Sequence, residues 1–297
     1  MQLSKLINSY YLSFDFKSLR QETKQQYQYF LSVLCATKIE DAKILGSINI
    51  SDITTKMAKV SYEQWCERGI HMANHVMSVS RVVYNYAIHM EHYTANPFTS
   101  IKRRTPVARK VVWTRENVHT FLDYAYQDFH TRNIGLIAQM AYEWCQRLGD
   151  MRVIMWDNVD LTKNKMHIEQ SKRRAEVFLP ISDDLCEMLL QQKEDYGFQK
   201  YVAPCTKPSM GVYTPYSKHR LPKLARDIMN NASLPIELRL SDLRRTGTTE
   251  MVDAGVSMGN IMAVTGHTNP QSVKPYMKNT LASANVAFNL RKKLTDE

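Results

Sequence analysis

Residues 241–276 read SDLRRTGTTEMVDAGVSMGNIMAVTGHTNPQSVKPY, and this stretch carries the most information about the fold and the chemistry of the chain. It places Arg244, His267 and Tyr276 at fixed intervals. A further arginine, Arg147, stands far upstream in the run CQRLGD. Two guanidinium groups, an imidazole and a phenol together suit phosphodiester chemistry, because the arginines can neutralise a phosphate while the tyrosine attacks it.

Phosphodiester transfer requires an in-line nucleophile, stabilisation of charge on the phosphoryl oxygens and a proton for the departing oxygen. Arg147 and Arg244 are the predicted clamp, because a guanidinium stays charged and its planar fork matches phosphate oxygens. Tyr276 is the predicted nucleophile, and its phenol, with an ordinary pKa of about 10, needs nearby cations to ease deprotonation. His267 can donate a hydrogen bond to a non-bridging oxygen.

Two more side chains complete this set. Lys172 lies in a Ser-Lys-Arg-Arg turn between two expected strands, from which it can reach the minor groove and protonate the leaving oxygen. Asp150 lies one helical turn after Arg147 and can orient its guanidinium. Each also has an ordinary interpretation, as a solvated turn lysine and as one half of a surface ion pair. Arg173 and Arg174 are expected to contact phosphates rather than to do chemistry.

Composition sets outer limits on the function. The chain has 297 residues, a hydrophobic content of 44% and a formal net charge of +10, which favour two domains and a polyanionic partner, with nucleic acid first. A basic surface without such a partner is the alternative. The five cysteines are scattered without a CxxC pair, so neither a disulfide framework nor a metal site is expected. With no signal pattern, and no apolar run near the roughly 20 residues of a membrane span, we expect a cytoplasmic, nucleoid-associated protein.

The pattern along the chain predicts a mainly α protein with a small β-sheet (α+β). Residues 1–100 read as a helical domain, in which Ser18–Gln21 resembles a capping box that opens the first helix. Residues 101–112 follow as a basic interdomain linker. Its cations are Lys102, Arg103, Arg104, Arg109 and Lys110. We interpret them as a strap along a DNA backbone, and the alternative is a solvated charged loop.

Residues 113–297 read as a mixed domain. Thr114 and Ser182 are expected to cap helices, and another helix is expected from about residue 133 to residue 145. Two strands, at 165–170 and 174–181, are expected to form a hairpin with a tight basic turn. Further helices are expected near 219–231, 242–254, 258–264 and 281–293, the last of them as a C-terminal tail helix.

Together these motifs resemble the tyrosine recombinase family, in particular its phage-type integrases. The run YEWCQRLGDMRVIMWDNVD at 142–160 is similar to the family's first-arginine box, with its acidic residue and following tryptophan. SDLRRT at 241–246 is similar to the His-x-x-Arg box, and IMAVTGH at 261–267 to the Leu-Gly-His segment, with Thr265 in place of the leucine. Tyr276 follows His267 by nine residues, a usual interval in the family.

The resemblance is strong over 113–297 and only general over about 12–100. It implies a helical core-binding domain and a mixed catalytic domain that clamp a duplex from opposite faces. Tyr276 would form a 3′-phosphotyrosyl bond and release a 5′ hydroxyl. Arg147, Arg244 and His267 would stabilise the phosphorane, with Lys172 as general acid. The covalent bond would conserve the energy, so neither ATP nor a metal is expected as a cofactor.

The resemblance also implies partners. Four protomers would assemble on two double-stranded DNA recombination sites, with accessory DNA-bending or directionality proteins as further partners. Arg245, beside Arg244, is expected to contact DNA. The tail helix either docks on a neighbouring subunit or packs in cis; its apolar residues are Ala282, Val286, Phe288 and Leu290.

Ser241 departs from the family pattern, which usually has histidine and sometimes lysine at this position. Serine can donate a hydrogen bond but cannot buffer a proton near neutral pH. It is therefore either a catalytic donor or the cap of the helix that carries Arg244.

Four functions fit these observations. An integrase of a phage or mobile element is favoured by the divergent motifs. The length also suits a Xer-type recombinase that resolves replicon dimers. A DNA-binding protein that has lost catalysis is disfavoured by the complete set of reactive residues. A relaxing topoisomerase would share the chemistry, but the separate helical N-terminal domain argues for recombination.

Overall fold

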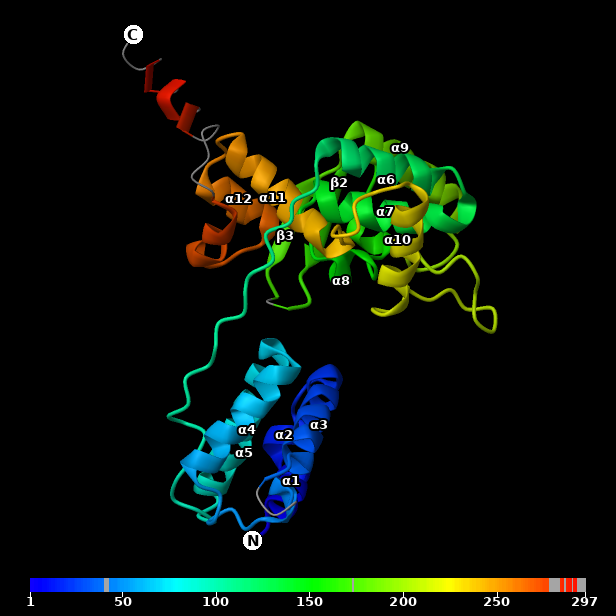
Figure 1. The fold of residues 1–297 in the computed structure, drawn as a ribbon. Coiled ribbons are helices and arrows are strands. Elements are labelled where there is room, and N and C mark those ends of the chain that lie inside the picture. The colour runs from blue at the N-terminus through cyan, green and yellow to red at the C-terminus, as the bar shows by residue number, and fades with distance from the viewer. Residues whose placement is uncertain (40–42, 173, 278–283, 286, 290, 293–297) are drawn as a thin grey trace. The chain divides into compact units, whose positions relative to one another are not determined.

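The computed structural model describes residues 1–39, 43–172, 174–277, 284–285, 287–289 and 291–292. The chain divides into two compact units, Met1–Arg109 and Lys110–Glu297 (Figure 1). Each has its own hydrophobic core, and no residue belongs to both. The fold is mainly helical with one small antiparallel sheet, which confirms the expected α+β class.

The first unit consists of helices. They are α1 (Leu3–Leu12), α2 (Phe14–Lys17), α3 (Gln21–Ala36), the short 3-10 helix η2 (Leu45–Ser47), α4 (Thr55–Arg68) and α5 (Ile70–His89). Apolar residues along α5 face the core of the unit, and among them Val76 and Val83 are fully buried. Thr54 caps α4 by accepting a hydrogen bond from the backbone N–H of Met57.

The predicted start of the first helix is wrong. The chain is already helical from Leu3, and α3 begins at Gln21 with no side-chain cap. The hydroxyl of Ser18 donates to the carbonyl of Asp15 instead of accepting a bond from a helix N–H group. A local side chain-to-backbone bond thus competes with the capping geometry that the sequence suggested.

The second unit combines helices with the sheet. Its helices are α6 (Arg115–Tyr126), α7 (Phe129–Glu143), α8 (Leu148–Met151), α9 (Asp183–Tyr196), α10 (Arg220–Asn231), α11 (Leu243–Asp253) and α12 (Met258–Thr265). Short 3-10 helices are η3 (Trp156–Asn158), η4 (Leu240–Asp242), η5 (Pro270–Ser272) and η6 (Lys274–Tyr276). Thr114 and Ser182 cap α6 and α9 as predicted.

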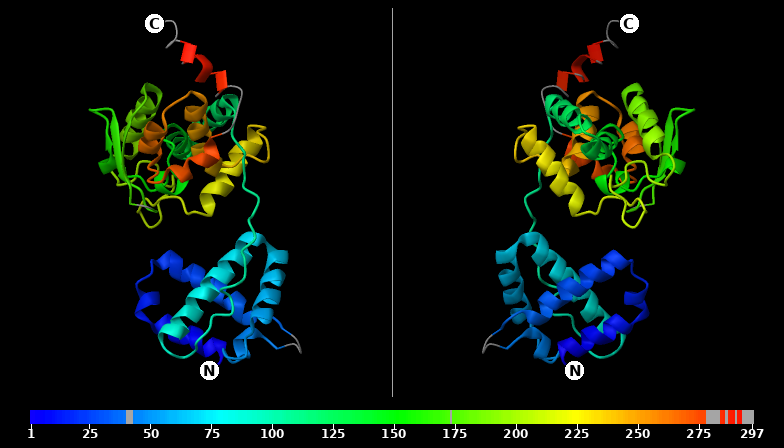
Figure 2. Two further views of the ribbon diagram at one scale, coloured as in Figure 1. Left: turned by 90° about the vertical axis from the view of Figure 1, so that its left-hand side faces the viewer. Right: turned by 90° about the vertical axis from the view of Figure 1, so that its right-hand side faces the viewer.

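The sheet has the order β1 (Val159–Asp160), β2 (Lys165–Glu169) and β3 (Glu176–Pro180), all antiparallel. It lies at one edge of the unit (Figure 2). One face buries Met166, Ile168, Val177 and Leu179 against the core, and the other is exposed. This alternation sets the register, because a shift by one residue would expose the apolar set. Lys172 lies three residues after the end of β2, in the connection to β3.

The segment 101–114 contains no helix or strand, but both of its ends are hydrogen-bonded. Tyr62 and Asn74 hold the backbone of Arg104 on the first unit, with distances of 2.7 and 2.8 Å. Trp113 is buried in the second unit, where its backbone N–H donates to Thr246 Oγ1 on α11. The part of the linker between these anchors is therefore 105–112.

The tail helix falls only partly within the described residues. Residues 284–285, 287–289 and 291–292 are helical, and Phe288 is exposed. Ala282, Val286 and Leu290 lie outside the described residues. Of the helices that the structure describes, none combines the length and the apolar character of a membrane span.

Candidate functional site

Arg147 lies in the short connection between α7 and α8. It is the N-cap residue of α8, and its Nη1 donates to Oε1 of Gln170 at 2.7 Å. The same nitrogen lies 3.8 Å from Oδ2 of Asp150, which is buried. The predicted contact between Arg147 and Asp150 is thus present, but it is not an ordinary surface ion pair, because the carboxylate is only 2% exposed.

Asp150 also reaches the hairpin. Its Oδ1 accepts hydrogen bonds from the hydroxyl and the backbone N–H of Ser171. One carboxylate therefore contacts Arg147 with one oxygen and holds the residue before Lys172 with the other. Lys172 itself is exposed in the turn. Asp150 can in this way position two predicted catalytic groups at once.

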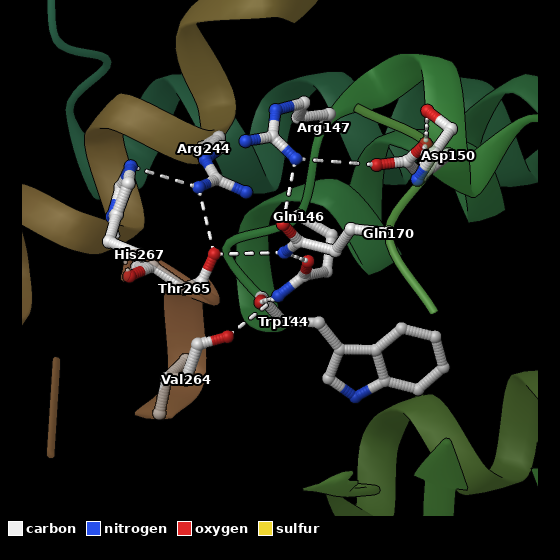
Figure 3. A network of polar contacts seen from close by, with 10 residues as sticks. Trp144, Gln146, Arg147, Asp150, Gln170, Arg244, Val264, Thr265 and His267 are labelled. Atoms are coloured by element: carbon white, nitrogen blue, oxygen red, sulfur yellow. Dashed lines mark hydrogen bonds and ion pairs between the residues drawn. The ribbon is translucent and has the colours of Figure 1, made fainter. Parts of the chain in front are cut away.

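Arg244 projects from the first turn of α11 and is 9% exposed. Its Nη2 donates to the carbonyl of Thr265 at 2.8 Å and lies 3.2 Å from Nε2 of His267 (Figure 3). Its Nη1 is buried and has no hydrogen-bond partner among the described residues. A buried guanidinium N–H without an acceptor is costly unless a ligand supplies one, so the arrangement favours an anion at this place.

The pKa of Arg244 is lowered by burial, with a further contribution from the nearby charge of Arg147. Tyr276 acts in the opposite direction through its hydroxyl, which raises the pKa of Arg244. Arg244 therefore lies within electrostatic reach of both Arg147 and Tyr276. The arginine stays charged at any working pH despite the shift.

His267 has a defined ring orientation. Its Nδ1 lies 2.7 Å from the hydroxyl of Thr265, and this hydroxyl donates its one hydrogen to the carbonyl of Ile261. The hydroxyl must then accept from Nδ1–H, which leaves Nε2 facing Arg244. A proton taken up by the ring at Nε2 would make this atom a hydrogen-bond donor for a phosphate oxygen.

Tyr276 lies on η6, beside the same cluster. Its ring centroid is 6.1 Å from that of His267, and the guanidinium carbon of Arg245 lies 5.1 Å from the Tyr276 centroid. Arg245 thus packs on the predicted nucleophile, while its expected contact with DNA stays a prediction.

The described residues bring together Arg147, Arg244, His267 and Tyr276, with Asp150 behind them. The other predicted site residues are placed less centrally. Arg174 is exposed and pairs with Glu169 at 4.0 Å, and Arg173 lies outside the described residues. Among the linker cations, Arg109 is half-buried; the exposed ones are Lys102, Arg103, Arg104 and Lys110.

The proposed cap function of Ser241 is wrong. Ser241 is exposed on η4, and the N-cap residue of α11 is Asp242, which makes no side-chain cap bond. The carboxylate of Asp242 instead accepts from the backbone N–H of Arg239 and closes the turn before the helix. A catalytic function of Ser241 stays a prediction.

Sequence reasoning missed the buried residues whose hydrogen bonds connect the segments that form the site. Gln146 and Gln170 are fully buried, and the carbonyl of Thr265 accepts from both Gln170 and Arg244 (Figure 3). Gly266 ends α12 in a left-handed conformation, with φ 67°. A glutamine carries no reactive group, so only the position of Gln170 just before the predicted hairpin turn pointed to it.

Two alternative chemistries find no support in the described residues. Burial raises the pKa of the Cys145 thiol to about 12, so this cysteine beside the cluster stays protonated and is a poor nucleophile. Within the described ranges, no three His, Cys, Asp or Glu side chains gather in a way that could hold a metal ion.

The sequence and the structure of the chain were compared with those of known proteins. The sequence profile of the phage integrase family matches residues 111–282. Among curated protein sequences, no significant match to the chain was found.

Solved structures show the same fold at low sequence identity. A lambda integrase fragment, crystallised as a dimer bound to a COC′ core site, superposes with a TM-score of 0.78 at 17% identity, covering 95% of this chain and 97% of that one. A lambda integrase tetramer bound to a Holliday junction gives 0.75 at 18%, covering 94% and 78%. A Tn1549 transposon integrase fragment in complex with circular intermediate DNA gives 0.74 at 14%, covering 97% and 99%.

Proposed function

The chain belongs to the phage integrase family and is a tyrosine site-specific recombinase, and we propose that it integrates or excises a phage or mobile element through a 3′-phosphotyrosyl intermediate. The single observation that carries this proposal is the buried Nη1 of Arg244, which lacks a partner among the described residues and lies in a site shared with Arg147, His267 and Tyr276. Such a site is complementary to a phosphodiester and to the additional charge of its transition state.

In the proposed reaction, Oη of Tyr276 attacks the scissile phosphorus. An O–P bond to the tyrosine forms while the P–O5′ bond breaks, and the phenol proton passes to solvent as the bond forms. Lys172 gives a proton to the departing 5′ oxygen. Arg147 and Arg244 neutralise the non-bridging oxygens, and His267, once its ring is also protonated at Nε2, donates a hydrogen bond to one of them. The 5′ hydroxyl of a partner strand then reverses these steps and restores the phenol.

The proposed assembly is a homotetramer on two double-stranded recombination sites. The lambda integrase tetramer on a Holliday junction supports this arrangement by likeness of fold. The net charge of +10 and the basic linker would supply contacts with the DNA backbone. In the same proposal, the subunits exchange their tail helices, and accessory DNA-bending or directionality proteins take part. The protein would act on the nucleoid, in the cytoplasm of a bacterial host.

The test begins by sequencing the junctions that the protein makes in cells, which defines the core sequence. A nicked duplex with this core should then trap a covalent protein–DNA adduct, because the short strand beyond the scissile phosphate diffuses away. We expect Tyr276→Phe to abolish the adduct and to retain DNA binding. An adduct formed by the phenylalanine variant would exclude Tyr276 as nucleophile. Tight binding by the wild-type protein without any adduct would favour the non-catalytic DNA-binding alternative.

The Xer-type alternative differs in its biological role and not in its chemistry. If the protein resolves replicon dimers, the mapped junctions should join identical sites on one replicon. Junctions between an element and a host chromosome would support integration.

A further inference from the structure

Gln170 follows β2 and is fully buried beneath the reactive cluster. Its Oε1 accepts a hydrogen bond from Nη1 of Arg147 at 2.7 Å. Its Nε2 donates to Oε1 of Gln146 at 2.6 Å and to the carbonyl of Thr265 at 2.9 Å (Figure 3). Both donors of this amide and its acceptor are therefore used, in the same small volume as the two arginines.

The neighbouring amide fixes the orientation of Gln170. Nε2 of Gln146 donates to the carbonyls of Trp144 and Val264, each at 2.7 Å, so its Oε1 must face Gln170. Gln170 must then present its NH₂ group to that oxygen and its own oxygen to Arg147. Rotation of either amide by half a turn would place acceptor against acceptor and donor against donor.

The carbonyl of Thr265 connects this amide to the second arginine. It accepts from Gln170 and also from Nη2 of Arg244, at 2.8 Å. One amide thus holds Arg147 directly and Arg244 through a shared oxygen. The next residue, Gly266, leaves room for it, because a Cβ at that position would lie 2.5 Å from Nε2 of Gln170.

The two guanidinium groups repel each other when no anion lies between them. Asp150 lies near Arg147, 3.8 Å from its Nη1. Arg244 is held by neutral groups, the carbonyl of Thr265 and the ring of His267. Neutral acceptors fix a cation without cancelling its charge, which leaves the charge available for a ligand.

We infer that Gln170 is a positioning residue that keeps Arg147 and Arg244 at the separation needed to neutralise one scissile phosphate. The inference rests on the proposed recombinase function and goes beyond it, because Gln170 is fully buried and its side chain bonds Arg147, Gln146 and Thr265 rather than the attacking tyrosine. Its contribution lies in the charge-stabilising step. The rate of strand cleavage should depend on Gln170, whereas DNA affinity should not.

The test compares two nicked duplexes with the mapped core sequence. One has the ordinary scissile phosphodiester, and the other has a methylphosphonate there, whose uncharged phosphorus centre has less need of the arginines. The variant is Gln170→Met, which keeps the length of the side chain and removes its hydrogen bonds. Gln192→Met is the matched control, because Gln192 is an equally buried glutamine of the same unit that bonds Asn133 and Val202 away from the site.

Release of the 5′-hydroxyl strand is measured at saturating protein, and the dissociation constant is measured in the Tyr276→Phe background. We expect Gln170→Met to cleave the phosphodiester about 10- to 100-fold more slowly, because a misplacement of catalytic groups by about 1 Å can cost on the order of 100-fold in rate. Its dissociation constant should be unchanged, and its methylphosphonate cleavage should stay close to wild type. Gln192→Met should change both substrates by the same factor. If Gln170→Met does not fold, Gln170→Glu replaces it, since it keeps an acceptor for Arg147 and removes both donors.

Several results would overturn the inference. These are wild-type cleavage of the phosphodiester by the Gln170 variant, equal losses on both substrates, or a loss explained entirely by weaker binding. Wild-type protein that cleaves the phosphodiester but leaves the methylphosphonate intact would also overturn it, because charge neutralisation would not then be the function of the arginine pair. Wild-type protein that cleaves neither duplex would instead refute the proposed function.

Discussion

At the scale of single residues, the proposed function of Lys172 as general acid can be tested by changing the leaving group. It is exposed in the β2–β3 turn, and the neighbouring Ser171 is held by Asp150. A general acid is needed only when the leaving group is a poor one. If a sulfur atom replaces the scissile 5′ oxygen, the leaving thiolate needs no proton, because a thiol has a pKa of about 8.5.

We therefore expect Lys172→Ala to slow cleavage of the ordinary duplex by about 100- to 10,000-fold, the usual contribution of general acid catalysis. On the 5′-sulfur duplex the variant should cleave nearly as fast as wild type. Lys165→Ala, at an exposed lysine on β2 of the same hairpin, should cleave both duplexes normally. Equal losses of Lys172→Ala on the two duplexes, measured by strand release, would show that this lysine has another function.

At the scale of elements, the site depends on the close approach of α11 to the end of α7. Gly247 on α11 makes this approach possible, because a Cβ there would lie 2.5 Å from the carbonyl of Tyr142 and 2.7 Å from Sγ of Cys145. Arg244 lies one turn before Gly247, and Arg147 follows Cys145 by two residues. The helix contact therefore helps to set the distance between the arginines.

Gly247→Ala should lower the free energy of unfolding by about 1–3 kcal/mol through overpacking, and it should slow strand cleavage. Gly259→Ala on α12 is the matched control, since no atom lies within 4 Å of a Cβ there. It should raise the free energy of unfolding by up to about 1 kcal/mol through helix propensity. Urea denaturation and the nicked-duplex assay measure both effects, and equal behaviour of the two variants would contradict this account of the helix contact.

The elements also show what the sequence could and could not predict. Caps with a side-chain acceptor, such as Thr114 and Ser182, were recognisable because the bond forms between residues three apart in the chain. Helix α1 has no side-chain cap, and strand β1 has only two residues, so neither left a local pattern. Gln170 was missed because its partners come from segments 23 to 95 residues away, and no local spacing encodes that convergence.

At the scale of the whole molecule, the two units should behave as separate folding domains. Their cores share no residue, and hydrogen bonds at Arg104 and Trp113 confine the irregular connection to 105–112. This stretch contains two trypsin sites, at Arg109 and Lys110. Cleavage there should leave each core intact.

We expect brief trypsin treatment to cut first at Arg109 or Lys110, with both fragments keeping helical circular dichroism. Core-site DNA should slow this cut, because the proposed strap would then lie on phosphates. Added salt should remove the protection, since phosphate contacts weaken steeply with ionic strength. Earlier cleavage inside either core would contradict the proposed domain organisation, and unchanged cleavage with DNA present would contradict the proposed strap.

The most direct measurement of the central claim is identification of the amino acid that becomes joined to DNA. The trapped adduct is digested with protease and nuclease, and the remaining peptide–nucleotide is sequenced by mass spectrometry. The account predicts a phosphate bridge from the Tyr276 hydroxyl to a 3′-terminal nucleotide. A nucleotide attached to any other residue, or through its 5′ end, would contradict it.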